Sequence, residues 1–192
     1  MTFGILVVCT GNICRSPIAE RLLVAGIQQR LGAGARAFEV SSAGTWGHSD
    51  AAMEPAAAAT VRELGGEPGG FRARELTSAH IAAADLVLTA TREHRAAVVT
   101  MVPRASGRTF TLREFARLTA GVEASELPGL PEERARALVG LAAGRRGIPP
   151  LPAPGEDDVA DPYGATAPAY RAVGRLVMAA IAGPLDLIAG PT

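Results

Sequence analysis

The sequence predicts an α/β domain: a compact, doubly wound sheet of four parallel strands, with helices on both faces and a functional loop after the first strand. Short apolar runs alternate along the 192 residues with stretches in which apolar residues recur at helical spacing. Strands that alternate with helices form right-handed crossovers and hence a parallel sheet. The run 3–8 is apolar throughout, as expected for a strand buried on both faces. The loop that follows it should lie at the carboxyl edge of the sheet, where open α/β sheets bind ligands.

Each further element has its own signal. Ser16 and Pro17 open a helix over 17–31, in which apolar residues recur at helical spacing. A closing helix over 166–189 carries a continuous apolar face. The elements expected between them are a strand at 37–42, a helix at 55–65, a helical segment at 78–83, a strand at 85–90, a helix at 91–100, a strand at 108–111 and one or two helical turns at 112–118.

The stretch 121–160 is predicted to be a surface insertion within a single domain of 1–192. It contains a probable helix at 131–144 between ends whose composition is typical of flexible loops. A solvent-exposed excursion is the favoured interpretation. A regulatory lid is the alternative, because the stretch leads directly into Asp161. Its prolines lie at positions 128, 131, 149, 150, 152 and 154.

Composition narrows the classes of function. The 19 basic and 19 acidic residues cancel, and no basic tract indicates binding to nucleic acid or to an anionic membrane surface. No apolar run is expected to reach the length of about 20 residues that spans a bilayer, and the first strand begins too early to leave room for a signal peptide. Both cysteines belong to one short motif, so no disulfide framework is expected. We therefore expect a soluble, cytoplasmic protein, either a monomer or a weak dimer.

Cys9 and Arg15 form the motif with the most chemical content. They stand six positions apart, in a short loop between the first strand and the first helix. This is the C-x5-R arrangement of cysteine-dependent phosphatases, in which the loop amides curl around a phosphate. The thiolate lies beneath the phosphorus, and the guanidinium holds two oxygens as a planar fork. The amino end of the following helix favours the anion further.

The loop resembles the signature C-x-G-N-x-C-R-S of the low-molecular-weight protein tyrosine phosphatases. Two further blocks match that family: Ser41–Thr45, which reads SSAGT, and Asp161–Gly164, which reads DPYG. Together the three blocks span most of the chain in the family's order. The fixed positions of the loop are all present, as Cys9, Gly11, Asn12, Cys14, Arg15 and Ser16.

The resemblance implies hydrolysis of phosphotyrosine, in proteins or as small aryl phosphates, with inorganic phosphate as the product. Cys9 would be the nucleophile and form a phosphocysteine, while Arg15 and the amides from Thr10 onward stabilise the transferring group. Asp161 would protonate the leaving phenolate and then activate water. The mechanism needs no metal and no organic cofactor.

Other loop residues have supporting roles. Ser16 is expected to donate a hydrogen bond to the thiolate. Gly11 keeps side-chain atoms away from the phosphate, and Asn12 tolerates a left-handed backbone conformation. By resemblance, Asn12 is tied to Ser42, which would stiffen the loop. By the same resemblance, Cys14 is expected to close a reversible disulfide with Cys9, so that the enzyme would be redox-regulated.

The substrate slot is expected to have apolar walls. Ile13, Trp46 and Tyr163 are the candidates, since each lies in or next to one of the three blocks and together they suit a flat ring. Many relatives carry a second aromatic residue after the tyrosine, where this chain has Gly164.

Several polar residues are given no catalytic role. Asp157 and Asp158 are interpreted as solvated loop charges, with a proton relay as the alternative. His48, His80 and His94 lack the spacing of a metal site, and His94 is assigned to the surface of its helix.

Three other functions are weighed. Arsenate reduction would require additional cysteines to relay a disulfide, and the chain has only Cys14 beside the nucleophile. A protein arginine phosphatase would carry Thr where this chain has the bulkier Ile13. A non-catalytic phosphopeptide-binding module would not need to keep Asp161.

Overall fold

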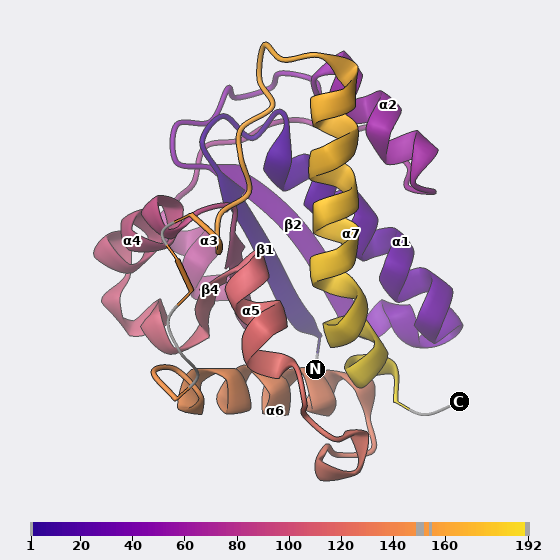
Figure 1. The fold of residues 1–192 in the computed structure, drawn as a ribbon, viewed down its shortest axis with the longest axis vertical. Helices are drawn as coiled ribbons and strands as arrows, with labels where there is room; N and C mark the ends of the chain where they lie inside the picture. Colours follow the sequence, from indigo (N-terminus) through magenta and orange to yellow (C-terminus); the bar gives the residue numbers. More distant parts are fainter. Residues whose placement is uncertain (1, 149–151, 154, 191–192) are drawn as a thin grey trace.

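The computed structural model describes residues 2–148, 152–153 and 155–190. Its centre is a parallel four-stranded sheet in the order β2-β1-β3-β4 (Figure 1). Although β1 and β3 are neighbours in the sheet, the chain leaves β1 toward β2 on one side and leaves β3 toward β4 on the other. This divergence opens a crevice at the carboxyl ends of the two strands. The strands are β1 (Phe3–Cys9), β2 (Phe38–Gly44), β3 (Leu86–Thr89) and β4 (Thr109–Thr111).

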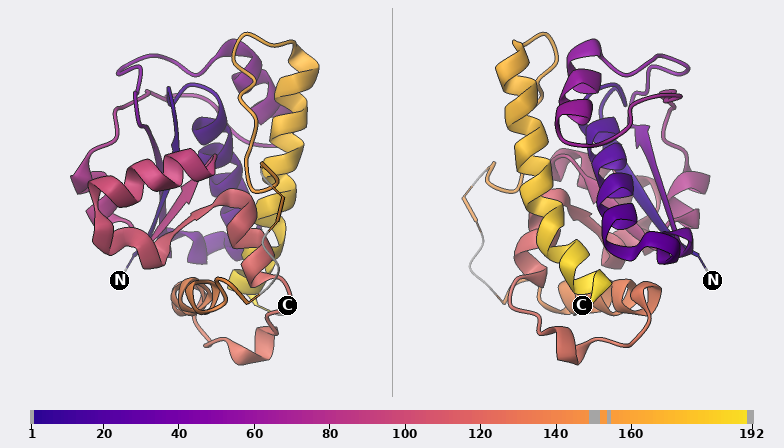
Figure 2. Two further views of the ribbon diagram at one scale, coloured as in Figure 1. Left: turned by 60° about the vertical axis from the view of Figure 1, so that its left-hand side comes forward. Right: turned by 90° about the vertical axis from the view of Figure 1, so that its right-hand side faces the viewer.

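Helices cover both faces of the sheet. The side chains of β1 alternate, so that Ile5 and Val7 point into one core while Leu6 and Val8 point into the other. The first core lies under α1, α5 and α7, and the views of Figure 2 show α1 and α7 side by side on that face. The helices are α1 (Arg15–Leu31), α2 (Pro55–Glu63), α3 (Ser78–Ala83), α4 (Arg92–Met101), α5 (Leu112–Thr119), α6 (Pro131–Gly144) and α7 (Ala167–Ala189).

The sequence predicted the architecture and every one of these elements, with boundaries within about two residues. Three short 3₁₀ segments were not predicted. Each follows or precedes a longer element, and a single turn of this kind has too short a sequence pattern to be recognised. They are η1 (Gly32–Ala37), η2 (Pro103–Arg108) and η3 (Ala124–Glu126).

The helix α6 corrects the expectation of a solvent-exposed excursion. Its residues Leu138 and Ala142 are fully buried in the main core, at the end of the sheet opposite the loop that follows β1 (Figure 1). Arg134 is 5% exposed and donates to the carbonyl of Leu187 at 2.6 Å, which joins α6 to the end of α7. The helix is therefore part of the domain core and does not lie over the site. Prolines 149, 150 and 154 lie outside the described residues.

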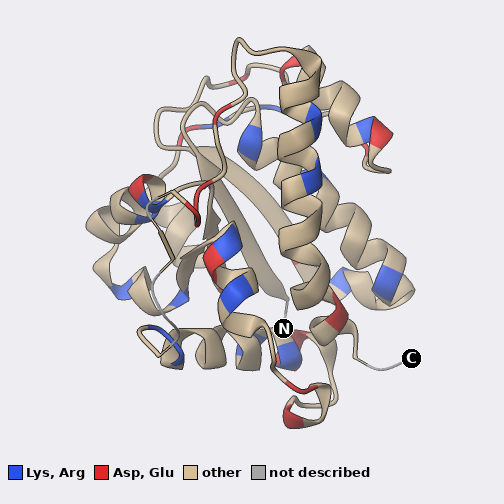
Figure 3. Cartoon of the chain, in the orientation of Figure 1, with Lys and Arg blue, Asp and Glu red and all other residues tan. Residues whose placement is uncertain are grey.

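The helix α7 corrects a second expectation. By length and composition it could cross a membrane, whereas no run of that length was expected from the sequence. Its apolar face packs on α1 and α5 in the main core, which accounts for its composition in a folded domain. Charged residues of both signs are interspersed over the ribbon in Figure 3, in keeping with the net charge of zero.

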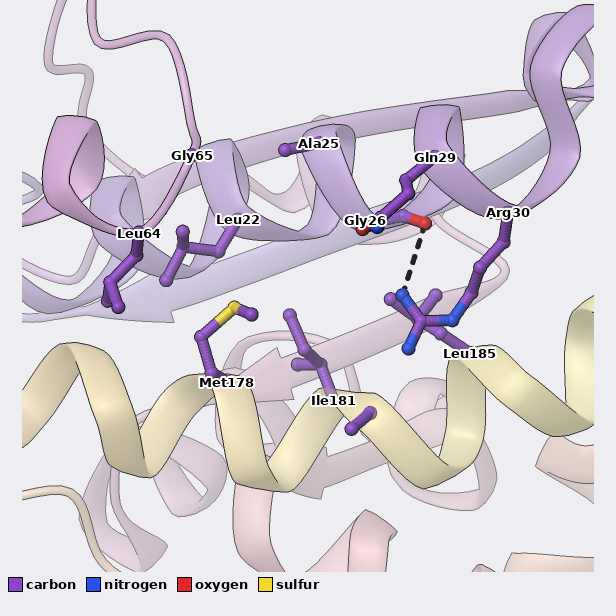
Figure 4. A pocket seen from close by; sticks show the side chains of 11 residues that line it. Leu22, Ala25, Gly26, Gln29, Arg30, Leu64, Gly65, Met178, Ile181 and Leu185 are labelled. Atoms are coloured by element: carbon purple, nitrogen blue, oxygen red, sulfur yellow. Dashed lines mark hydrogen bonds between the residues drawn. The ribbon is translucent and has the colours of Figure 1, made fainter.

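A groove of roughly 480 Å³ separates α1 from α7 on the outside of the molecule (Figure 4). Leu22 and Ile181 line it from the two helices, and an ion pair between Arg30 and Asp186 at 2.7 Å lies at one end. Beneath it the helices are in close contact, because a Cβ atom on Gly26 would lie only 2.7 Å from Leu185. The groove is lined by residues of α1, α7 and the end of α2, none of which belongs to the C-x5-R loop.

Candidate active site

The loop Cys9–Cys14 connects β1 to the amino end of α1, as the sequence predicted. Asn12 adopts the left-handed conformation, with φ of 55°, and Gly11 lies so close to His48 that a Cβ atom there would be 2.8 Å from the imidazole. The carbonyl groups of the loop accept hydrogen bonds from amides of the segment that follows β2. The donor and acceptor pairs are Thr45 to Cys9 (2.9 Å), Trp46 to Thr10 (3.0 Å), His48 to Gly11 (3.1 Å) and Glu54 to Ile13 (3.0 Å).

The side chain of Asn12 organises the base of the loop. Its Oδ1 accepts from the amide of Arg74 at 2.9 Å, which fixes the orientation of the side-chain amide. Its Nδ2 must then donate, and it does so to Ser16 Oγ and Ser42 Oγ, both at 2.8 Å. Ser42 Oγ in turn donates a hydrogen bond to the carboxylate of Glu20 at 2.6 Å. Burial raises the pKa of Glu20, and the bond from Ser42 opposes that shift.

The direction of these hydrogen bonds determines how Ser16 interacts with Cys9. Ser16 Oγ lies 3.0 Å from Cys9 Sγ and already accepts from Asn12, so its own proton is available for the sulfur. Cys9 is 2% exposed at the floor of the pocket. The second thiol differs, because burial raises the pKa of Cys14 to about 12 and its sulfur faces Tyr170 Oη at 3.8 Å. Ser16 Oγ can thus donate to the sulfur of Cys9, whereas the raised pKa of Cys14 keeps that thiol protonated at neutral pH.

The guanidinium of Arg15 is 5% exposed and brings distant segments together. Its Nη2 donates to Asp161 Oδ2 at 2.5 Å and to Thr10 Oγ1 at 3.1 Å, and its Nη1 donates to the carbonyl of Val159 at 3.4 Å. The carboxylate of Asp161 remains 46% exposed, so it faces both the guanidinium and the open pocket. Cys9, Arg15 and Asp161, separated by up to 152 positions in sequence, thus line one pocket.

Asp157 and Asp158 correct the prediction of solvated charges. Asp157 is 4% exposed and accepts from Arg92 at 3.0 Å and from Arg117 at 3.1 Å. Burial alone would raise the pKa of Asp157, but the bonds from the two arginines outweigh it and lower the pKa. Asp158 accepts from the amide of Arg92 at 2.8 Å, at the first residue of α4. Both carboxylates therefore attach the segment that carries Asp161 to α4 and α5.

Comparisons with known proteins identify the family of this chain. Residues 4–128 match the model of the family described as low molecular weight phosphotyrosine protein phosphatase. The chain belongs to this family. Its curated relatives include the low molecular weight protein-tyrosine-phosphatase Etp of Escherichia coli, 36% identical over 125 residues, which are 65% of this chain and 75% of that protein. The protein-arginine-phosphatase of Geobacillus stearothermophilus is 37% identical over 121 residues, 63% of this chain and 76% of that protein.

Solved structures of the family share the fold. The low molecular weight protein tyrosine phosphatase of T. tengcongensis superposes with a TM-score of 0.68 at 26% identity, over 95% of this chain and 97% of that one. The YwlE arginine phosphatase of Geobacillus stearothermophilus gives 0.66 at 28% identity, over 95% and 90%. The family match ends at residue 128, so it covers the loop and Ser42 but not Asp161.

The pocket that contains Cys9, Arg15 and Asp161 also contains the three residues named as apolar walls. Ile13, Trp46 and Tyr163 line a cavity of about 280 Å³ together with the reactive groups, and Trp46 and Tyr163 are 73% and 63% exposed at its rim. His48, which the sequence interpretation left without a role, lines the same pocket with its ring 6.0 Å from that of Trp46. In the described parts of the chain, no three His, Cys, Asp or Glu side chains are grouped as a metal ion would need.

His94 corrects the assignment to the helix surface. It is 7% exposed, and its Nε2 lies 2.9 Å from Thr10 Oγ1 in the loop. The prediction was wrong because the polar sequence around position 94 is typical of an exposed helix. The order β2-β1-β3-β4 places the start of α4 beside the loop after β1, and only a prediction of strand order would have found this contact.

Proposed function

We propose that this phosphatase hydrolyses phosphotyrosine through a phosphocysteine at Cys9. The observation that supports this most is the approach of three groups in one pocket: a thiol with a hydroxyl donor, a buried guanidinium and a carboxylate. The phosphoryl oxygens bind the fork of Arg15 and the amides of the loop, whose carbonyls are engaged elsewhere. In the free enzyme the carboxylate of Asp161 accepts a hydrogen bond from the guanidinium of Arg15. The phosphate must therefore displace this carboxylate from Arg15.

Two chemical steps follow. The sulfur of Cys9 attacks phosphorus in line, the bond from phosphorus to the phenolic oxygen breaks, and protonated Asp161 gives its proton to the leaving oxygen. Asp161, now a carboxylate, takes a proton from water. The water oxygen attacks phosphorus, and the thiolate departs as inorganic phosphate is released.

Substitution of Cys9 tests this proposal. Cys9→Ser should abolish turnover of 4-nitrophenyl phosphate while binding of inorganic phosphate stays measurable by calorimetry, because Arg15 and the loop amides remain. Rapid quenching of the wild type should trap a phosphorylated Cys9. Substantial turnover by Cys9→Ser would disprove the phosphocysteine route.

Selectivity for phosphotyrosine follows from the apolar rim. Ile13, Trp46 and Tyr163 favour a long flat side chain, whereas phosphoserine would bring its backbone against the rim before its phosphorus reached Cys9. We expect a preference of at least about a hundredfold, roughly 2.7 kcal/mol, which burial of one aromatic ring can supply.

Arginine phosphatase activity is the second candidate, because a relative of that name is 37% identical. Ile13 should disfavour it, since an apolar side chain suits a phenyl ring better than a guanidinium. Ile13→Thr should raise activity on phosphoarginine peptides relative to phosphotyrosine peptides. An unchanged ratio would mean that Ile13 does not select the substrate.

The remaining expectations do not depend on the proposed steps of phosphate hydrolysis. A reversible disulfide between Cys9 and Cys14 predicts that peroxide-treated wild type recovers with dithiothreitol better than Cys14→Ser does. The raised pKa of Cys14 makes slow closure the expected behaviour. A cytoplasmic location and a state of monomer or weak dimer stay predictions from the sequence.

A further inference from the structure

His94 is a buried polar residue that the proposed mechanism does not use. Its ring lies between the first turn of α4 and the loop after β1, with both nitrogens engaged by hydroxyl groups. Nδ1 lies 2.7 Å from Thr91 Oγ1, the residue that caps α4, and Nε2 lies 2.9 Å from Thr10 Oγ1. The ring therefore connects a helix cap to the loop.

Thr10 extends this connection to Arg15. Its hydroxyl accepts from Arg15 Nη2 at 3.1 Å and still has a second lone pair and a proton for His94. Either neutral tautomer of the imidazole fits, since Thr10 can donate to Nε2 or accept from it. The chain of contacts runs from Thr91 through His94 and Thr10 to the guanidinium.

Burial and the nearby cation of Arg15 keep the ring neutral. It faces Arg15 at the start of α1, Glu93 on its own helix, and Asp158 and Asp161 on the returning segment. Burial and then the charge of Arg15 lower the pKa of His94 to about 4, against the opposing effect of the carboxylates. At neutral pH the imidazole can thus support the guanidinium without placing a second cation beside it.

The other contacts of Arg15 do not replace this support. Asp161 must leave the guanidinium when phosphate binds, the contact to the Val159 carbonyl is long at 3.4 Å, and Arg15 Nε has no partner among the described residues. Thr10 is the remaining side chain bonded to the guanidinium. A planar fork binds two phosphoryl oxygens only in one orientation, so its anchoring matters.

We propose that His94 is a positioning residue that acts through Thr10 to hold the Arg15 guanidinium in the orientation that grips the phosphoryl group. This rests on the proposed role of Arg15 in binding phosphate. It assigns a function to a histidine on an element outside the loop, and it predicts that only the ring position facing Thr10 matters for catalysis.

Two substitutions by amide side chains distinguish the roles of the two ring nitrogens of His94. His94→Asn keeps a polar atom near the place of Nδ1, facing Thr91, whereas His94→Gln keeps one near the place of Nε2, facing Thr10. With 4-nitrophenyl phosphate, His94→Asn should lower kcat/KM by about ten- to a hundredfold, the scale of a misplaced catalytic group, and His94→Gln should stay within about threefold of the wild type. His80→Asn, on α3 and outside the pocket, is the control and should leave kcat/KM unchanged.

A double-mutant cycle then tests the route through Thr10. Thr10→Val removes the hydroxyl at constant shape, together with its direct bond to Arg15, so it should cost at least as much as His94→Asn. The double variant should be no worse than the poorer single one. Losses that multiply, or equal activity of the Asn and Gln variants, would overturn the proposal.

Measurements in the Cys9→Ser background separate this proposal from the proposed reaction. There, inorganic phosphate binding, measured by calorimetry, should weaken with His94→Asn and not with His94→Gln, whatever the fate of the phosphocysteine. If neither variant folds, the ¹⁵N resonances of the His94 ring are compared between the wild type and the Thr10→Val variant. They should shift while those of His80 do not, and unshifted His94 resonances would overturn the proposal.

Discussion

The loop after β1 and the segment that returns to it from α6 contribute the two halves of the site by different means. The loop carries the proposed nucleophile, the arginine and the hydroxyl donor proposed for the thiolate within eight residues, Cys9–Ser16, at the junction of a buried strand and a helix. The returning segment, 155–166, has no helix or strand and runs past α5 to the top of α7, in orange in Figure 1.

Long-range contacts replace secondary structure in the returning segment. Asp157 pairs with Arg92 and Arg117, and the amide of Val159 donates to the carbonyl of Ala90 at 2.8 Å. These partners belong to α4, α5 and the end of β3. The comparison teaches that the proposed nucleophile is placed by local geometry, whereas the proposed general acid depends on the whole fold for its position.

The largest expected effect lies in the loop. Arg15→Lys keeps the charge but removes the planar fork and its bonds to Thr10 and Asp161, so kcat/KM for 4-nitrophenyl phosphate should fall by at least about a thousandfold. Steady-state kinetics measure this. A loss below about tenfold would show that charge alone suffices and that the loop does not need the geometry of the guanidinium.

A smaller and substrate-dependent effect is expected at Asp161. Asp161→Asn should slow phenyl phosphate by about a hundredfold or more, because its leaving group needs a proton. It should slow 4-nitrophenyl phosphate much less, because that leaving group departs unprotonated. Equal losses on the two substrates would remove Asp161 from the role of acid.

Loss of the ion pairs that hold the returning segment should lower activity less than Asp161→Asn, with the same dependence on the leaving group. Asp157→Asn loses the charge that holds Arg92 and Arg117, so Asp161 should be placed less accurately. We expect about a tenfold loss with phenyl phosphate and little with 4-nitrophenyl phosphate. Glu156→Gln, an exposed neighbour, is the matched control. A loss that is equal on both substrates would indicate that Asp157 stabilises the fold and not the acid.

The last expected effect concerns stability and pH. His94 has a folded-state pKa of about 4, below its unfolded value near 6.5, so the unfolded chain binds more protons between these values. The contribution is fully present above about pH 6.5 and is lost as the pH falls, by about 2 kcal/mol at pH 5. Urea unfolding of wild type and His94→Gln at pH 7 and pH 5 measures it. A wild type whose loss equals that of the variant would contradict a buried, neutral His94.

The sequence by itself determined the strands, the helices and the loop, because their signals are local: apolar periodicity, the Ser16–Pro17 helix start and the spacing of Cys9 and Arg15. The DPYG block suggested Asp161 as the acid. Misassigned residues were those whose surroundings come from distant parts of the chain: Asp157, His94 and the buried face of α6. Their local sequences are polar or proline-rich and are typical of solvent-exposed segments.

Only the tertiary structure decided what these residues contact. The order β2-β1-β3-β4 brings the start of α4 beside Thr10, and the packing of α6 and α5 sets the path by which Asp161 returns to Arg15. A buried charge or imidazole is stable only where partners compensate its loss of water. Those partners, Arg92 and Arg117 for Asp157 and two threonines for His94, lie up to 84 positions away in the sequence.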